Sequence, residues 1–100
     1  ELVLAVIQVE SYFDRYAISV AGAQGLMQIM PFWLDEIGRP EDNLFNIGTN
    51  LRYGCAILKH YLERERGDLN KALARYNGSV GKTWYPERVL KALSQRWYER

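Results

Sequence analysis

The fold is organised around residues 9–31, which read VESYFDRYAISVAGAQGLMQIMP and carry Glu10 at their second position. The residues before Glu10 are nearly all apolar, and they are Leu2, Val3, Leu4, Ala5, Val6, Ile7 and Val9. A helix over about residues 1–11 would be apolar on every side, which is typical of a helix that is buried all round.

Glu10 would then carry a carboxyl at the end of a buried helix. Burial disfavours the charged form of a carboxyl, so we expect the pKa of Glu10 to lie well above its ordinary value of about 4.3. Such a group is a candidate proton donor near neutral pH. The alternative is that Glu10 is only the first solvated residue after an apolar run.

The composition indicates one ordinary globular domain. The chain has 100 residues, of which 48% are apolar, 13% aromatic and 25% charged. A chain of this length can bury a hydrophobic core without disulfides. The 13 basic and 12 acidic residues are interleaved and leave a net charge of +1, which forms neither a basic stripe nor an acidic tail. We therefore expect no nucleic-acid partner.

The sequence shows no signature of a metal or cofactor site. Cys55 is the only cysteine and His60 the only histidine, and neither a CxxC nor an HExxH motif occurs. We expect no cofactor and no metal. No apolar run reaches the roughly 20 residues of a membrane span, and the first residue already lies inside the apolar pattern. Residues 1–100 are therefore expected to be a single domain, clipped at its N-terminus from a longer exported protein.

The first half of the chain predicts short helices joined by loops. After the first helix, Ser19 and the glycines near it interrupt the periodicity and predict a long loop. Residues 24–29 are predicted as a short helix. A further short helix is expected between Pro31 and Gly38, because proline suits a first helical position and glycine the residue past a helix end. Residues 39–45 are predicted as a polar loop.

A long amphipathic helix is predicted from Asn46 or Thr49 to about Gly67. Its apolar stripe is formed by Leu51, Cys55, Leu58 and Leu62. Cys55 is therefore expected as a small buried thiol rather than a nucleophile. His60 lies off that stripe and is expected to be solvated.

The last third of the chain predicts two more helices. Asp68 can cap a helix that Gly78 ends. Pro86 is expected at the first position of the last helix, whose apolar register is Tyr85, Val89, Leu93 and Trp97. No strand pattern occurs, so we expect an all-α fold packed around the helix that carries Glu10.

Several of these residues together carry a family resemblance. In order along the chain, the matching residues are Glu10-Ser11, Ser19, GAQGLMQIMP at 22–31, Asn50-Leu51 with Gly54, and Tyr76-Asn77. In this order they resemble the signature of the soluble lytic transglycosylase family, which is similar to goose-type lysozyme. The resemblance implies a lysozyme-like α domain that cleaves the β-1,4 bond between N-acetylmuramic acid and N-acetylglucosamine in peptidoglycan. It also implies 1,6-anhydromuramic acid product ends.

The resemblance implies roles for particular residues. Glu10 matches the family's single catalytic acid, and Tyr76 matches the tyrosine that points its hydroxyl at that acid. Ser19, Gln28 and Met30 match positions that line the glycan groove, and Asn77 is taken with them as substrate-binding. The chain departs from the family pattern in reading RYNGSVG where many members read AYNAGPG, and it lacks the Glu-Thr-Arg that some members carry before the last tyrosine.

The chemistry of the residues leaves one alternative open. Most glycosidases use two carboxylates, about 5–5.5 Å apart in retaining enzymes and about 6.5–9.5 Å apart in inverting ones. Asp14 could share a helix face with Glu10 if the helix ran that far, but a turn position for Asp14 is favoured. One acid suffices if the 6-hydroxyl of the muramoyl residue attacks its own anomeric carbon, because that hydroxyl is already tethered to the reacting sugar.

The expected partner is therefore a peptidoglycan glycan strand. We expect a monomer located in the bacterial periplasm or cell envelope, with membrane association of the full-length protein left open. The rival hypotheses are a hydrolytic lysozyme of the same fold and a cell-wall binding domain without activity.

Overall fold

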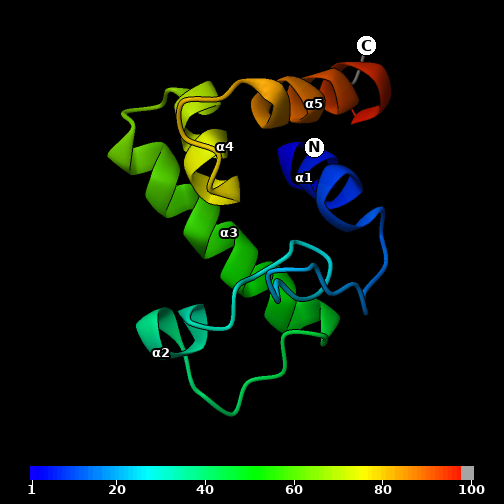
Figure 1. The fold of residues 1–100 in the computed structure, drawn as a ribbon, viewed down its shortest axis with the longest axis vertical. Helices are drawn as coiled ribbons and strands as arrows, with labels where there is room; N and C mark the ends of the chain where they lie inside the picture. The colour runs from blue at the N-terminus through cyan, green and yellow to red at the C-terminus, as the bar shows by residue number, and fades with distance from the viewer. Residues whose placement is uncertain (98–100) are drawn as a thin grey trace.

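The structure is a computed structural model that describes residues 1–97, and these residues form an all-α fold without a β-strand (Figure 1). The helices are α1 (Leu2–Ser11), α2 (Trp33–Ile37), α3 (Ile47–Arg64), α4 (Leu69–Asn77) and α5 (Trp84–Ala92), and a π-helical turn (Leu93–Trp97) continues α5. The predicted fold class is confirmed.

Helix α1 lies beside α5 and the π-helical turn, and α4 packs on both α3 and α5 (Figure 1). Ala5 and Val6 of α1 are fully buried, and Ile7 is nearly so. Leu4, however, is 38% exposed. The prediction of a helix buried all round was therefore wrong on one side, because α5 and the π-helical turn do not enclose α1 completely.

Helix α1 ends after Ser11 because Tyr12 adopts a left-handed conformation, with φ 52°, and its backbone N–H donates to the carbonyl oxygens of Ile7 and Gln8. The chain then leaves the helix as an exposed loop. Asp14 lies in this loop, is exposed, and accepts a 2.9 Å hydrogen bond from the backbone N–H of Tyr16. The prediction that Asp14 is a turn residue is confirmed.

Residues 24–29 form a tight reversing turn, not the predicted helix. The backbone groups of Gln24 and Ile29 bond to each other in both directions, at 2.9 and 3.0 Å. Gly25 (φ 78°) and Gln28 (φ 54°) both lie in the left-handed region, which a right-handed helix cannot contain. The turn is held from outside by Asn50 of α3.

Helix α3 begins as predicted, because the Asn46 side chain caps it by accepting from the backbone N–H of Thr49 at 3.0 Å. The prediction of a buried Cys55 was wrong, since Cys55 is exposed. The buried face of α3 is centred on Gly54 and Ile57, and each residue turns the helix by about 100°. Cys55 therefore falls beyond the edge of that face.

Helix α4 has the predicted capping residues, whereas α5 begins earlier than predicted. The Asp68 side chain accepts from the backbone N–H of Lys71 at 3.1 Å, and Gly78 ends α4 with φ 81°, both as predicted. Helix α5 begins at Trp84, two residues before Pro86, so Pro86 lies within the first turn rather than at its first position. A proline is tolerated there because the first turn has no internal partner for its N–H.

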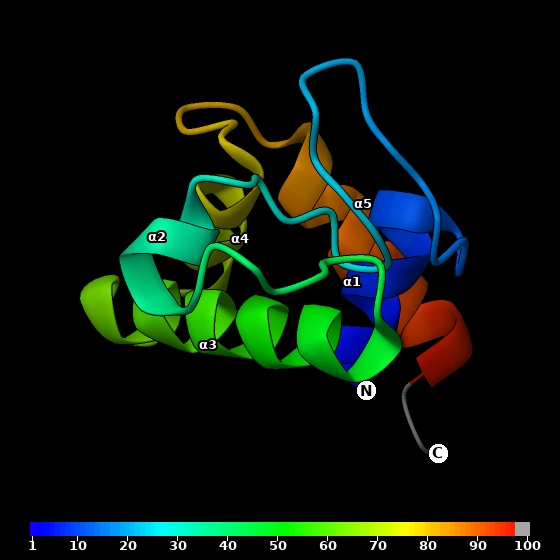
Figure 2. The same ribbon diagram turned by 90° about the horizontal axis from the view of Figure 1, so that it is seen from below.

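The loop over residues 12–23, which follows α1, and the α4–α5 connection over residues 78–83 project to the same side of the molecule, away from α3 (Figure 2). The first of these segments begins at the C-terminal end of α1. Glu10 occupies that end.

Candidate active site

The centre of the candidate site is the Glu10 carboxyl, near the C-terminal end of α1. Burial raises the pKa of Glu10 from its ordinary value of 4.5 to about 7, against the smaller opposing effects of the Tyr85 and Asn77 side chains. No acidic residue is among the groups that shift this pKa. Glu10 is therefore a carboxyl that can both hold and release a proton near neutral pH.

Tyr85 is a residue that the sequence assigned only to the apolar register of the last helix. It is 1% exposed, and its hydroxyl is buried without a partner at full hydrogen-bonding geometry among residues 1–97. Burial and the neighbouring Glu10 charge both raise the pKa of Tyr85, so the phenol stays protonated. A neutral hydroxyl beside Glu10 favours the charged carboxylate, which is how Tyr85 lowers the Glu10 pKa.

Tyr76 lies on α4, and its hydroxyl donates a 2.7 Å hydrogen bond to the carbonyl oxygen of Met27. Burial raises the pKa of Tyr76, and the charge of Glu10 adds to the effect, so the phenol is near Glu10. Because a phenol has one proton to donate, Tyr76 in this structure gives it to Met27 rather than to Glu10.

Asn77 is the last residue of α4, directly before the Gly78 turn. Its side chain approaches Glu10 and favours the charged carboxylate. Asn77 was expected to bind substrate, and the structure also brings it to the acid. The site is thus assembled by the ends of three helices: α1 brings Glu10, α4 brings Tyr76 and Asn77, and α5 brings Tyr85.

The 24–29 turn beside this site is fixed by buried Asn50. The Asn50 side-chain oxygen accepts from the backbone N–H of Met27 at 2.9 Å, and its amide donates to the carbonyl oxygens of Gln24 (2.9 Å) and Leu44 (2.8 Å). All of its main hydrogen-bonding groups are satisfied, as a buried amide requires. Ser11 adds a bond from its hydroxyl to the carbonyl oxygen of Leu26, at 2.7 Å. The turn is therefore rigidly tied to both α1 and α3.

Ser19 and Gln28 were expected to line a glycan groove, and in the structure both bond to backbone groups of the 17–25 loop. The Ser19 hydroxyl accepts from the backbone N–H of Ala23 at 3.0 Å. The Gln28 amide donates to the carbonyl oxygens of Ala17 (3.1 Å) and Gly25 (2.9 Å), which uses both of its hydrogens. The Gln28 side-chain oxygen remains as an acceptor. Met30 is half-buried at the end of the turn.

The described part of the chain shows no cluster of side chains that could bind a metal ion. Among residues 1–97, no group of three or more His, Cys, Asp or Glu side chains is placed to hold one. In the same residues no helix is both long and apolar enough to cross a bilayer.

The sequence of this chain is similar to those of several known proteins. The sequence model of the transglycosylase SLT domain matches residues 1–96. The transglycosylase of Enterobacteria phage PRD1 is 35% identical over 100 residues, which cover 93% of this chain and 37% of the phage protein. The membrane-bound lytic murein transglycosylase F of Desulfosudis oleivorans is 32% identical over 106 residues, covering 97% of this chain and 23% of that protein.

A solved structure shows the same arrangement of helices. The 70 kDa soluble lytic transglycosylase of Escherichia coli superposes with a TM-score of 0.68 and 26% sequence identity, over 93% of this chain and 15% of that one. This chain therefore spans well under half the length of each of these three relatives.

Proposed function

Because this chain belongs to the transglycosylase SLT domain family, we propose that it is a peptidoglycan lytic transglycosylase unit. It cleaves the β-1,4 bond between N-acetylmuramic acid and N-acetylglucosamine without water, leaving 1,6-anhydromuramic acid ends. The observation that carries the proposal is Glu10, a single carboxyl with a pKa of about 7 where three helices meet.

In the first step, protonated Glu10 donates its proton to the glycosidic oxygen while the bond from that oxygen to the anomeric carbon breaks. At pH 7, a pKa of about 7 leaves roughly half of the molecules protonated. The 4-hydroxyl of N-acetylglucosamine leaves, and the 2-acetamido oxygen of the muramoyl residue stabilises the positive charge on its own anomeric carbon.

In the second step, the Glu10 carboxylate takes the proton of the muramoyl 6-hydroxyl as that oxygen bonds to the anomeric carbon. The acid regains its proton and the sugar closes into a 1,6-anhydro ring. Asn77 and Tyr85 favour the charged form of Glu10, so they support the first step, in which Glu10 gives up its proton and becomes the carboxylate used here. Each proton transfer of this kind contributes about 10²- to 10⁴-fold to the rate.

A hydrolytic lysozyme is the second candidate function. It would need a second carboxylate as nucleophile or water-activating base. Asp14, the nearest candidate in the sequence, is exposed and bonded to the turn backbone. This position supports the transglycosylase reaction over hydrolysis.

The proposal extends to the surroundings of the enzyme. The relative from Desulfosudis oleivorans is named as a membrane-bound lytic murein transglycosylase, and we infer that this chain also acts in the cell envelope, in the periplasm. We further propose that it acts as a monomer. The relatives carry the matching segment within longer chains. We infer that residues 1–100 are the single catalytic domain of such a protein.

The experiment is a release assay on purified sacculi with wild type, Glu10→Gln and Glu41→Gln. Glu41 is exposed in the loop after α2 and serves as a matched control. The amide of Gln is nearly isosteric with the acid but has no proton to donate at this step. We expect Glu10→Gln to lose at least about 100-fold in turnover while still binding glycan, and Glu41→Gln to behave as wild type. Turnover of Glu10→Gln near the wild-type rate would move the catalytic role elsewhere.

A further inference from the structure

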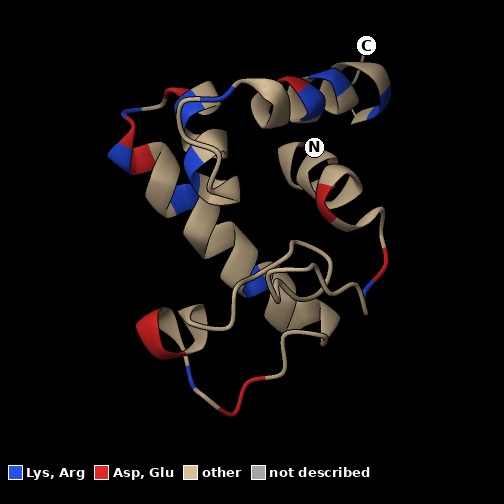
Figure 3. Ribbon diagram, in the orientation of Figure 1, with Lys and Arg blue, Asp and Glu red and all other residues tan. Residues whose placement is uncertain are grey.

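Helix α5 and the π-helical turn after it carry an excess of positive charge on their exposed side (Figure 3). Residues 82–97 contain four basic residues and one acidic residue, Glu87, whereas the whole chain has a net charge of only +1. The basic residues, all of them exposed, are Lys82, Arg88, Lys91 and Arg96. The rest of the chain is therefore acidic on balance, and the net positive charge of the molecule comes from this segment.

A shallow hollow of about 230 Å³ lies between α1 and this part of α5. Its walls include Gln8 and Tyr12 from the end of α1, and Arg88 and Lys91 from α5. Residues two apart in an α-helix point about 200° apart around its axis, so Gln8 and Glu10 lie on nearly opposite sides of α1. The hollow therefore lies behind the helix that carries the acid, and it has no part in the mechanism described above.

Aromatic side chains around this hollow are open to solvent. Tyr12 is 73% exposed, Phe13 45% and Trp84 46%. The Phe13 ring contacts the Trp97 ring, with 5.9 Å between the ring centroids. The Arg88 guanidinium lies over the Trp84 ring, 5.3 Å from its centroid. Rings and cations thus share one surface, which we call the aromatic–basic face and define by Tyr12, Phe13, Trp84, Arg88 and Lys91.

Tyr12 and Phe13 are held in a backbone conformation that is unfavourable for residues with a side chain. Their φ values are 52° and 65°, in the left-handed region that glycine adopts without steric cost. Glycine is the usual residue where a helix ends in this way. Because most of the Tyr12 ring is exposed, packing does not account for a tyrosine here. Strain of this kind at an exposed aromatic residue favours a binding role for its ring.

We propose that the aromatic–basic face docks on the surface of an anionic phospholipid bilayer. Tyrosine and tryptophan rings concentrate where a bilayer meets water, because each ring has an apolar body and one polar group. Phe13 adds an apolar ring beside them. Each exposed Lys or Arg near an anionic lipid surface strengthens binding about fivefold. Among residues 1–97 no ion pair engages Arg88 or Lys91, so both are available to lipid headgroups.

The charge of this face favours lipid over a second glycan strand. A strand of N-acetylated sugars whose lactyl groups are amide-linked is uncharged, and it would leave Arg88 and Lys91 without an anion. An anionic phospholipid offers a phosphate to these cations and an apolar boundary to the rings. A domain docked through this face keeps Glu10 on the far side of α1, where the glycan can reach it.

The first arm of the test measures binding to vesicles by sedimentation. The 100-residue chain is mixed with vesicles of phosphatidylglycerol and phosphatidylcholine, or of phosphatidylcholine alone. We expect binding to the anionic vesicles that weakens as salt is raised. Arg88→Gln/Lys91→Gln should weaken it about 25-fold, which is about fivefold for each cation.

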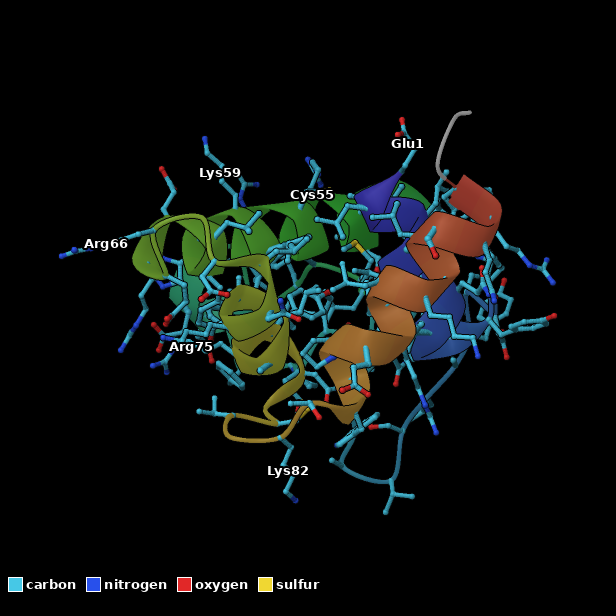
Figure 4. All side chains as sticks on the ribbon, turned by 90° about the horizontal axis from the view of Figure 1, so that it is seen from above. Glu1, Cys55, Lys59, Arg66, Arg75 and Lys82 are labelled. Atoms are coloured by element: carbon cyan, nitrogen blue, oxygen red, sulfur yellow. The ribbon has the colours of Figure 1, made fainter. Side chains whose placement is uncertain are left out.

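A matched control removes the same charges elsewhere. Lys59 and Arg66 project from α3 and from the turn after it, away from α5 (Figure 4). Lys59→Gln/Arg66→Gln should bind the anionic vesicles as wild type does. Equal weakening in the two double variants would overturn the proposal, as would equal binding of wild type to the neutral vesicles or no binding to the anionic ones.

Tyr12→Gly separates a binding role of the ring from a structural one. We expect several-fold weaker binding to the anionic vesicles, because the exposed ring is lost. The thermal unfolding midpoint should stay at or above that of wild type, because glycine adopts the left-handed conformation without strain. Unchanged vesicle binding in this variant would overturn the proposal, whatever its unfolding midpoint.

The second arm distinguishes a lipid surface from an acidic protein partner. Backbone amide resonances are followed while micelles of a short-chain phosphatidylglycerol, or soluble polyglutamate, are added. We expect larger shifts at Tyr12, Arg88 and Lys91 with the lipid, because polyglutamate offers carboxylates but no apolar boundary. Equal shifts with polyglutamate would assign the face to acidic proteins and overturn the proposal. Neither arm contains peptidoglycan, so the result is independent of the proposed function.

Discussion

The Tyr76 hydroxyl and the Met27 carbonyl oxygen, 49 residues apart in the sequence, are joined by a 2.7 Å hydrogen bond. This bond ties α4 to the 24–29 turn beside Glu10. Met27 is fully buried, so its carbonyl oxygen has no access to water. Tyr76 therefore lies near Glu10 and also fixes the position of the 24–29 turn.

Tyr76→Phe should therefore destabilise the domain. Removing the hydroxyl leaves the buried Met27 carbonyl without this partner, at a cost of about 1–3 kcal/mol. Urea unfolding followed by circular dichroism measures the change. Tyr85→Phe is the matched comparison, because the Tyr85 hydroxyl has no partner at full hydrogen-bonding geometry, and its free energy of unfolding should stay within about 1 kcal/mol of wild type. A larger loss in Tyr85→Phe than in Tyr76→Phe would contradict these assignments.

Tyr85→Phe should instead raise the pKa of Glu10. The Tyr85 hydroxyl opposes the effect of burial on this carboxyl, so its removal leaves desolvation less compensated. A carbon-13 NMR titration of the Glu10 side chain should place the midpoint above the wild-type value of about 7. An unchanged or lower midpoint would show that the Tyr85 hydroxyl does not interact with Glu10.

The stability of the protein should depend on pH through Glu10. Its pKa is 4.5 as an ordinary carboxyl and about 7 in the folded protein, so between these values the folded state binds more protons than the unfolded state. The contribution of Glu10 to the free energy of unfolding is then fully present below about pH 4.5 and is lost as pH rises through about 7. The loss reaches about 3 kcal/mol at most.

Glu10→Gln, which cannot ionise, should lack this loss and be more stable than wild type at pH 8. Glu41→Gln should keep the wild-type profile. Thermal or urea unfolding at pH 5 and pH 8 measures both. A Glu10→Gln variant that is less stable than wild type at pH 8 would argue against a buried acid.

Gly54→Ala should destabilise the packing of α3 on the 24–29 turn. A Cβ at Gly54 would overlap the Met27 side chain, which is fully buried, and overpacking of this kind costs about 1–3 kcal/mol. Gly48→Ala in the same helix is the control, because its Cβ would meet only the Asn46 side-chain oxygen at 3.6 Å. It should be neutral or stabilising by about 1 kcal/mol. Equal effects of the two substitutions would show that Gly54 is not a contact point.

The sequence predicted most of the helices because their ends carry local signals. Asn46, Asp68 and Gly78 act on backbone groups within three residues of themselves, so their effects are visible without tertiary structure. The 24–29 turn was mispredicted as helix because Asn50, which holds it, is more than twenty residues away. The hydrogen bonds of the buried Asn50 side chain outweigh the local helix propensity of residues 24–29.

The site was only partly predictable for the same reason. The apolar run before Glu10 indicated a raised pKa, and the burial of Glu10 in the structure agrees in direction. Tyr85 was not recognised because the register of α5 shows that its ring is buried, but not that its hydroxyl is directed at α1. That direction depends on how α5 packs against α1.

The most direct test of the account is the chemistry of the product ends. Purified sacculi are digested with wild-type protein, and the soluble fragments are analysed by mass spectrometry before and after borohydride reduction. If Glu10 is the single catalytic carboxyl, the muramoyl 6-hydroxyl should be the attacking group. The fragments should then be one water lighter than lysozyme products, and borohydride should leave their mass unchanged. Predominantly reducible muramic acid ends would contradict the transglycosylase reaction and show that water is the attacking group.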